Sequence, residues 1–266
     1  MARPLAAITG ASSGIGAEFA RKLATRYDLL LIARRVERLD ALAAELTARH
    51  GCAVEVLVAD LTESTQLSTV AEKLASVPEL ALLVNNAGFG ARDLVWQSDI
   101  ELLDRMHRLN VIAVLRLSHA ALRNMIPRQA GAIINVASVA GFVRRAGSAS
   151  YGATKAWVVA FTETLHLEMQ SIGSPIRVQA LCPGYTYSEF HDTMNVDRAK
   201  IASTRYWLSA ESVVDASLRG LQTGRLFVIP GWRYWLIVNI ISCMPLSWRP
   251  YFESKAPGKR KILNIR

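Results

Sequence analysis

Short runs of apolar residues recur along the chain, and longer segments with a helical period of apolar residues separate most of them. The runs are nearly continuous rather than alternating, which is typical of strands buried on both faces of a parallel sheet. Strands are predicted at Leu5–Thr9, Asp28–Ala33, Ala53–Ala59, Leu80–Val84, Ala132–Ala137, Ile176–Leu181 and Leu226–Ile229. Strands that alternate with helices predict an α/β fold: a doubly wound (Rossmann) parallel sheet of seven strands with helices on both faces.

The series continues without a linker, a repeat or a low-complexity tract, so we expect one domain over residues 1–231. Two stretches are less regular. Residues 185–208 are one of them, a loop in which we expect specificity for a ligand to lie, and residues 232–266, which combine an apolar helix with a basic tail, are the other. The composition, 51% apolar and 20% charged, excludes disorder for most of the chain.

The formal net charge of +9 would attract nucleic acid, an anionic membrane or a phosphorylated ligand, and its sign alone does not choose among them. No basic platform with interleaved aromatic residues and no recognition-helix pattern is visible, so we expect no nucleic-acid partner. The most membrane-like stretch, residues 234–248, has 15 uncharged residues, whereas a spanning helix needs about 20 apolar ones. The N-terminus lacks the pattern of an export signal, and we expect a cytoplasmic protein.

The three cysteines and five histidines show no spacing suited to metal ligands, and an odd number of scattered cysteines does not suggest a disulfide framework. We therefore expect no metal site and a reducing compartment. His191 has a second interpretation because it falls in the expected substrate loop, although we favour a structural role for it.

The clearest ligand-binding motif is a glycine-rich turn after the first predicted strand, which reads TGASSGIG at residues 9–16 and leads into a helix expected over Ala17–Thr25. Glycines allow a tight turn and let backbone N–H groups approach a pyrophosphate, and the helix N-terminus favours the anion. No Gly-Lys-Ser/Thr follows, which argues against a P-loop. Taken alone, the motif would also fit a plain connection between a strand and a helix.

Other motifs agree with this turn, and together they resemble those of the short-chain dehydrogenase/reductase family, in its compact TGxxxGxG branch. They are Asp60-Leu61, Asn85-Asn86-Ala87-Gly88, Asn110, Ser138, Tyr151-Gly152-Ala153-Thr154-Lys155 and Pro183-Gly184. The resemblance covers nearly the whole chain and implies a nicotinamide-dependent oxidoreductase. It places Asp60 near the adenine, the turn at residues 85–88 beside the ribose, and Pro183-Gly184 near the nicotinamide.

The cofactor-binding residues that we expect are Gly10, Ser12, Ser13, Gly14, Ile15, Gly16, Arg34, Arg35, Asp60, Leu61, Asn86, Ala87, Gly88, Tyr151, Lys155, Pro183, Gly184 and Thr186. The choice between the two nicotinamide cofactors depends on the end of the second strand, where an acidic residue would bind a ribose 2′-hydroxyl. Arg34 and Arg35 stand there instead, and guanidinium groups suit a phosphate. We expect NADP (NADPH), even if one of the two arginines is only a solvated residue at the start of a helix over Val36–His50.

Tyr151 and Lys155 are four residues apart, so on a helix they share one face. A nearby ammonium and an oxidised nicotinamide would favour the phenolate and lower the pKa of Tyr151 from its usual value of about 10, which suits an acid–base catalyst. In the family, the residue matching Ser138 binds the substrate oxygen, and the one matching Asn110 holds a water in a proton relay through the lysine. The expected catalytic residues are Asn110, Ser138, Tyr151 and Lys155.

These residues predict an enzyme that interconverts a ketone and a secondary alcohol. The loop over residues 182–192 and the apolar tail resemble a bacterial branch related to steroid and long-chain 3-oxoacyl reductases, which implies an apolar small-molecule substrate. The alternative from another class is a non-catalytic redox sensor that binds NADP(H) and regulates a partner. Oxidation of NADPH that depends on a carbonyl compound would distinguish the two.

Two surfaces suggest partners. Val158, Phe161, Leu165 and Met169 form an apolar stripe on a helix expected over Tyr151–Gln170. This helix and the one near Asp99–Met125 resemble those through which the family forms homodimers and homotetramers, although the stripe would also fit a helix that faces the sheet.

The second surface is the tail. A helix over residues 234–247 would place Ile237, Ile240, Ile241 and Met244 on one side, and Pro245 would end it. Residues 249–266 then carry six cations and one acid. A peripheral membrane contact is consistent with this pattern, and so is a helix that covers the substrate cleft or a subunit interface and is followed by a solvated basic end.

Overall fold

The computed structural model describes residues 3–91, 94–189 and 204–249, and within them seven parallel strands form one sheet in the order β3-β2-β1-β4-β5-β6-β7. The strands are β1 (Leu5–Thr9), β2 (Asp28–Ala33), β3 (Val54–Val58), β4 (Leu80–Asn85), β5 (Ala132–Val136), β6 (Arg177–Leu181) and β7 (Phe227–Val228). All seven predicted strands are confirmed, each within two residues at either end. The order reverses between β1 and β4, and a doubly wound sheet binds its ligand beyond the carboxyl ends of the strands at such a point.

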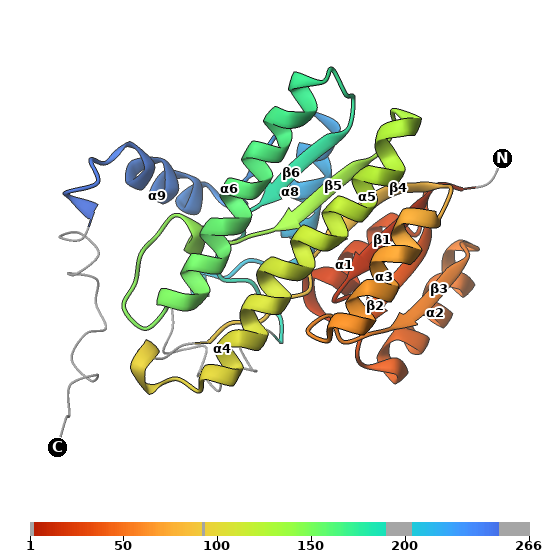
Figure 1. Cartoon of the computed structure of the whole chain (residues 1–266), viewed down its shortest axis with the longest axis horizontal. Coiled ribbons are helices and arrows are strands. Elements are labelled where there is room, and N and C mark those ends of the chain that lie inside the picture. Colours follow the sequence, from red (N-terminus) through yellow and green to blue (C-terminus); the bar gives the residue numbers. More distant parts are fainter. Residues whose placement is uncertain (1–2, 92–93, 190–203, 250–266) are drawn as a thin grey trace.

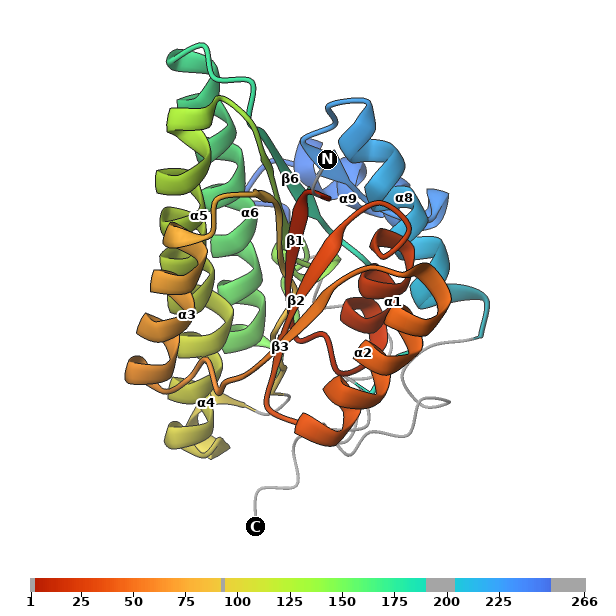
Figure 2. The same cartoon turned by 90° about the vertical axis from the view of Figure 1, so that its right-hand side faces the viewer.

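Helices cover both faces of the sheet, as Figures 1 and 2 show. One face carries α1 (Gly14–Leu23), α2 (Val36–His50) and α8 (Ala210–Gln222), and the other carries α3 (Ser64–Ser76), α5 (Val114–Arg128) and α6 (Ala149–Ser171). A further helix, α4 (Ile100–His107), runs through the π-helical turn η2 (Arg108–Ala113) into α5. Three short 3-10 turns are η1 (Val95–Gln97), η3 (Val139–Gly141) and η5 (Thr204–Tyr206), and α9 (Trp232–Cys243) follows β7.

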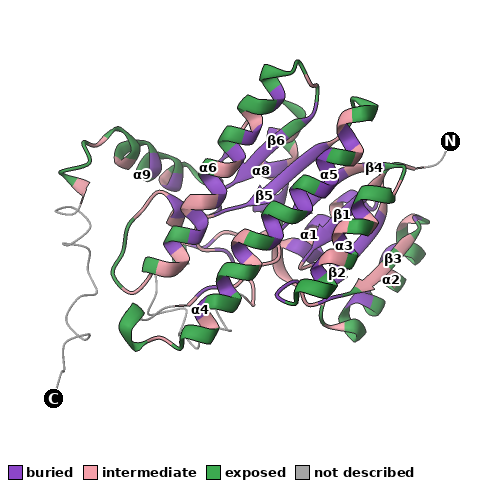
Figure 3. Ribbon diagram, viewed as in Figure 1, coloured by how far each residue is buried: buried purple, intermediate pink, exposed green. Residues whose placement is uncertain are grey.

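The central strands are buried on both faces, which explains their continuous apolar sequences (Figure 3). In β2, Leu29 and Leu31 belong to the core under α1 and α2, whereas Leu30 and Ile32 belong to the core under α3 and α5. The stripe on α6 is used in the same way: Leu165 and Met169 are buried in that second core, and Val158 and Phe161 pack inward as well. The stripe therefore faces the sheet and gives no support to a homo-oligomer.

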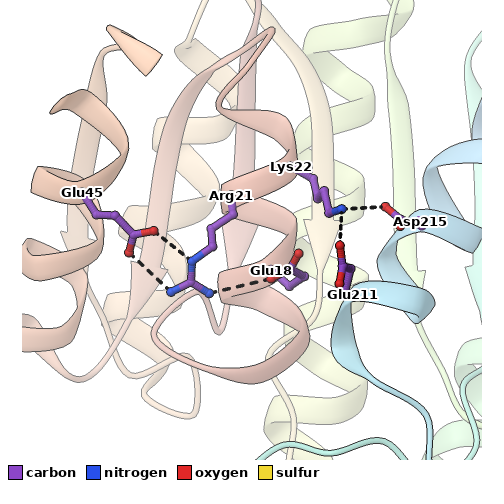
Figure 4. Close-up of polar contacts among 6 residues, drawn as sticks. All are labelled: Glu18, Arg21, Lys22, Glu45, Glu211 and Asp215. Atoms are coloured by element: carbon purple, nitrogen blue, oxygen red, sulfur yellow. Dashed lines mark hydrogen bonds and ion pairs between the residues drawn. The ribbon is translucent and has the colours of Figure 1, made fainter. Parts of the chain in front are cut away.

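Ion pairs connect α1 with both of its neighbouring helices (Figure 4). Arg21 Nε lies 3.1 Å from Glu45 Oε1 of α2, and Lys22 Nζ lies 3.0 Å from Glu211 and 3.1 Å from Asp215 of α8. These groups are partly or largely exposed, so water screens each pair and its contribution to stability is small.

The predicted C-terminal helix exists, and its two buried residues are not among the four apolar residues named for one of its sides. Tyr234 and Val238 are buried, whereas Ile237 is 38% and Ile240 is 54% exposed. The helix ends at Cys243, two residues before Pro245. No helix in the described part of the chain combines the length and apolarity that crossing a membrane requires.

Candidate active site

A cavity of about 580 Å³ lies at the carboxyl ends of the strands, beside the point where the strand order reverses. Nearly all of the expected site residues line it: Gly10, Ser12, Ser13, Gly14, Ile15, Arg34, Arg35, Asp60, Leu61, Asn86, Ala87, Gly88, Ser138, Tyr151, Lys155, Pro183, Gly184 and Thr186. Two expected site residues, Gly16 and Asn110, are not part of the lining, but both contact residues near it. The structure thus brings together residues that lie up to 176 positions apart in the sequence.

The glycine-rich turn is shaped for a close approach between backbones. Gly10 has a φ of +66°, and a Cβ there would lie 2.8 Å from Asn86 Nδ2; a Cβ on Gly16 would lie 2.3 Å from the carbonyl oxygen of Gly10. Ser13 precedes α1 without a side-chain cap, so the first N–H groups of the helix remain available to an anion at the cavity wall. A pyrophosphate fits this turn.

The turn after β4 is locked onto the glycine turn by the buried Thr9. Its hydroxyl accepts hydrogen bonds from the backbone N–H groups of Asn86 at 2.9 Å and Ala87 at 3.0 Å. In return, Asn86 Nδ2 donates to the carbonyl oxygen of Thr9 at 2.9 Å. These bonds fix the floor of the cavity where the adjacent strands end.

Arg35 lies over the glycine turn and is held by three groups. Its guanidinium donates to Ser12 Oγ at 2.9 Å and Ser13 Oγ at 2.8 Å, and its Nη1 lies 2.7 Å from Glu189 Oε2. The second oxygen of Glu189 contacts Arg38 Nη1. Hydrogen bonds from Arg35 and Arg38 hold the pKa of Glu189 at about 2, so its carboxylate is ionised. Sequence reasoning missed both Glu189 and Arg38.

Arg34 lines the same end of the cavity and is 70% exposed at its side chain. Its Nη1 lies 3.5 Å from Asp60 Oδ2, while Asp60 Oδ1 accepts hydrogen bonds from the N–H and hydroxyl of Thr62 at 3.0 and 2.8 Å. Burial opposes ionisation of Asp60, but the bonds from Thr62 and the charge of Arg34 outweigh it and leave the pKa of Asp60 below its ordinary value. Both arginines therefore lie where a phosphate on the adenosine ribose could be bound.

The expected catalytic side chains meet at the ends of β5 and α6. Ser138 caps η3, accepting from the N–H of Ala140 at 3.1 Å, and a side-chain hydrogen bond joins it to Tyr151. Lys155 lies one helical turn beyond Tyr151, with its Nζ 5.9 Å from the centroid of the tyrosine ring. Its Nζ also donates to the carbonyl oxygen of Val136 at 2.8 Å.

In the chain alone, without the oxidised nicotinamide that our expectation included, the pKa of Tyr151 lies above its ordinary value. Burial raises it to about 12, and the hydrogen bond with Ser138 offsets this only in part. Burial also lowers the pKa of Lys155, to about 8. The lowering of the pKa of Tyr151 by a bound cofactor stays a prediction.

Asn110 lies in the π-helical turn and is 1% exposed. Its Nδ2 donates to the carbonyl oxygen of Phe89 at 2.9 Å and to Thr154 Oγ1 at 3.2 Å, and its Oδ1 accepts from the N–H of Phe89. A Cβ on Gly88 would lie 2.9 Å from this Oδ1. The side chain thus joins the segment after Gly88 to α6, and its part in a proton relay stays a prediction.

Tyr234 and Ile237 of α9 also line the cavity, and we did not predict them. The hydroxyl of Tyr234 donates to the carbonyl oxygen of Tyr206 at 2.6 Å and accepts from the N–H of Tyr185 at 3.0 Å. Its ring covers Gly184, where a Cβ would lie 2.1 Å from Tyr234 Cζ. The apolar period of the tail was the available signal for Ile237, but it gave no sign of Tyr234. His191 lies outside the described residues, as do residues 190–203 of the expected substrate loop.

Comparison with known proteins gives a family. The family model described as short chain dehydrogenase matches residues 4–199. A very-long-chain 3-oxoacyl-CoA reductase from Anas platyrhynchos is 34% identical over 185 residues, which are 68% of this chain and 59% of that protein. The chain thus spans less than two thirds of that relative.

Solved structures agree over a greater length. A short-chain dehydrogenase from Sphingobium yanoikuyae in complex with NADPH is 36% identical, with a TM-score of 0.82 over 92% of this chain and 97% of that one. A bulky-bulky ketone specific alcohol dehydrogenase from Comamonas testosteroni is 32% identical, with a TM-score of 0.78 over 93% of this chain and 97% of that one.

The described residues hold no cluster of three His, Cys, Asp or Glu side chains suited to a metal ion.

Proposed function

The chain belongs to the short-chain dehydrogenase family of oxidoreductases, and on that premise we propose that it interconverts a ketone and a secondary alcohol with NADP(H) as cofactor. The observation that carries the proposal is the meeting of Ser138, Tyr151 and Lys155 at the wall of one cavity that also contains the glycine-rich turn. None of the relatives reported above favours a non-catalytic sensor.

The chain's own residues fit the reductive direction at neutral pH. The chemistry that NADPH would supply, when bound along the glycine-rich turn, is a hydride for the carbonyl carbon. Because burial holds the pKa of Tyr151 at about 12, its hydroxyl keeps its proton until the developing alkoxide takes it. The hydroxyl of Ser138 is joined to Tyr151 and orients the same substrate oxygen. Lys155 is protonated below about pH 8, so it keeps a positive charge near that oxygen.

The preference for NADP(H) rests on Arg34 and Arg35. Both line the cavity at the end of β2, where an acidic residue would repel a 2′-phosphate. The Ser12 and Ser13 hydroxyls hold Arg35 over the turn that would bind the pyrophosphate. A guanidinium fixed in this way binds a phosphate with little loss of conformational entropy.

The substrate class rests on the apolar side chains that line the cavity in addition to the expected cofactor-binding residues. Besides Ser138 and Tyr151 the lining includes Phe89, Leu109, Val139, Val143 and Ile237, together with the polar Arg145 and Ser148. The apolar side chains suit a hydrophobic ketone. The solved relative that is specific for bulky-bulky ketones supports the same class.

The test is the absorbance of NADPH during incubation with a panel of carbonyl compounds that differ in apolar bulk. We expect consumption of NADPH with bulky apolar ketones, and little with small polar aldehydes. A purified chain that binds NADPH but consumes none with any ketone would overturn the proposal.

We also propose that the exposed side of α9 contacts an anionic membrane. Trp232, Trp235 and Ile240 are 68%, 56% and 54% exposed, and Arg233 lies over the ring of Trp232 at 4.8 Å. Aromatic residues beside cations are typical of helices at membrane surfaces. The basic run that follows Trp248 adds charge of the right sign. The competing interpretation is that a second copy of this chain covers this side, in a homodimer or homotetramer.

A further inference from the structure

The carboxylate of Glu189 lies between two guanidinium groups at the edge of the cofactor cavity. One oxygen accepts from Arg35 Nη1 at 2.7 Å, and the other contacts Arg38 Nη1. Glu189 and Arg35 both line the cavity, whereas Arg38 is not part of its lining. A negative charge from the chain itself therefore lies on the arginine that faces the ligand.

The two residues that precede Glu189 are anchored by packing and by a backbone hydrogen bond. Ser188 lies against the start of α1, since a Cβ on Gly14 would lie 2.9 Å from Ser188 Cβ. Tyr187 donates its N–H to the carbonyl oxygen of Leu208 at 2.9 Å, and its ring stacks on Trp207 with centroids 5.0 Å apart. The position of Glu189 is thus set by the packing of its own segment, in addition to the attraction of the arginines.

We propose that Glu189 is a specificity-determining residue for the cofactor, because its carboxylate holds the place on Arg35 that the 2′-phosphate of NADP(H) takes and must be displaced when the phosphate binds. Carboxylate and phosphate oxygens are equivalent partners for a guanidinium fork, and two anions on one face of it repel each other. NADH carries a hydroxyl at that position and can bind while the Arg35–Glu189 pair persists. The inference rests on the proposed preference for NADP(H).

Arg38 makes the exchange possible without leaving a charge unpaired. It contacts the oxygen of Glu189 that Arg35 does not bind. When the phosphate displaces the carboxylate from Arg35, the carboxylate keeps this second partner. Glu189 therefore reduces the affinity for the phosphate-bearing cofactor without excluding it, and it narrows the difference between NADPH and NADH.

The test measures binding to the full chain by calorimetry, without turnover. The ligands are NADPH and 2′,5′-ADP, which carry the 2′-phosphate, and NADH and 5′-AMP, which do not. In Glu189→Gln we expect binding of the first two to tighten about two- to fivefold, the range that the loss of one half-exposed ion pair allows. Binding of the other two should stay the same.

The matched control is Glu37→Gln, which removes the same charge from the exposed first turn of α2. It should change none of the four affinities. Equal tightening of all four ligands in Glu189→Gln, or no tightening, overturns the inference; Glu189→Ala replaces this variant if its thermal midpoint falls. A wild-type chain that binds NADH as tightly as NADPH would instead contradict the proposed cofactor preference.

Discussion

The ammonium of Lys155 donates a hydrogen bond to the backbone carbonyl of Val136 at 2.8 Å, so the last residue of β5 holds a buried charge on α6 in place. Without this bond the long side chain would adopt many rotamers. With it, the charge is fixed 5.9 Å from the centre of the Tyr151 ring. One main-chain carbonyl thus determines where positive charge is found in the catalytic site.

The first prediction concerns pH. Burial lowers the pKa of Lys155 to about 8, so we expect NADPH binding to weaken as pH rises through this value and the charge is lost. In the unfolded chain Lys155 keeps its proton up to the ordinary lysine pKa of 10.5. The unfolded chain therefore binds more protons between these two values, and this group makes the folded state more stable as pH rises between them.

Calorimetric titration of NADPH at a series of pH values, together with urea unfolding of the unliganded chain, measures both effects. Lys155→Met should remove the dependence on pH near 8 in each experiment. An NADPH affinity that is constant from neutral pH to pH 10 would contradict the prediction.

The second prediction is that Tyr151→Phe loses nearly all turnover and keeps its affinity for NADPH. Phenylalanine retains the aromatic ring and lacks the transferable proton. We expect turnover to fall by about a hundredfold or more, from the size of general acid catalysis. Activity within a few-fold of the wild type would exclude Tyr151 as the proton donor. Binding of NADPH, measured separately, shows that the variant is folded.

The third prediction is a preference for NADPH that depends on the arginines. Arg34→Asp replaces an attraction to the 2′-phosphate by a repulsion, and we expect affinity for NADPH to fall about tenfold or more. Affinity for NADH should change little, so the preference is abolished or reversed. The ratio of kcat/KM for the two cofactors provides an independent measurement. Equal loss with both cofactors would indicate damage to the fold of the turn instead.

The fourth prediction concerns a buried polar chain under α5 and α6. Asn85 Nδ2 donates to Ser118 Oγ at 3.0 Å and to Asn135 Oδ1 at 2.9 Å, and Asn135 Nδ2 donates to Thr162 Oγ1 at 3.0 Å. Asn135→Ala removes the middle of this chain and leaves buried polar groups unpaired, so the free energy of unfolding should fall by about 2–4 kcal/mol. The exposed Ser76→Ala serves as control and should change it by less than about 0.5 kcal/mol.

The fifth prediction distinguishes a membrane from a second copy of this chain as the partner of the exposed side of α9. The wild-type chain should co-sediment with anionic vesicles at low salt, and the triple variant Trp232→Ser, Trp235→Ser, Ile240→Ser should not. These side chains are exposed, so the variant should remain folded. If the variant instead changes a dimeric mass to a monomeric one in light scattering, without an effect on vesicle binding, the side is an interface between copies of this chain.

The sheet and the cofactor end were predictable because each depends on local patterns. Continuous apolar runs give buried strands, and a glycine turn needs only the residues between Thr9 and Gly16. The positions of Tyr151 and Lys155 follow from helical spacing, and α6 confirms it. Patterns of this kind involve residues that are close in the sequence, so they can be recognised without knowledge of the tertiary structure.

The remaining features depend on contacts between distant residues. The pair of Arg35 with Glu189 joins residues 154 positions apart, and no local pattern relates them. The period of the isoleucines in α9 gave no sign of Tyr234, whose hydroxyl is held by the backbone of Tyr185 and Tyr206. The pKa of Tyr151 likewise depends on how completely the fold removes water from it, which spacing does not reveal.

The hydrogen bond between Tyr234 and the N–H of Tyr185 has a consequence for how the protein is made. Its partners are 49 residues apart, and Tyr234 is the later of the two to leave the ribosome. The first strands can pair while synthesis continues, because domains generally form from the N-terminal side during translation. The segment after β6, however, receives its anchoring hydroxyl only when α9 has emerged. A nascent chain that stops before this helix would have the sheet and the glycine turn, with the wall beside Gly184 still missing.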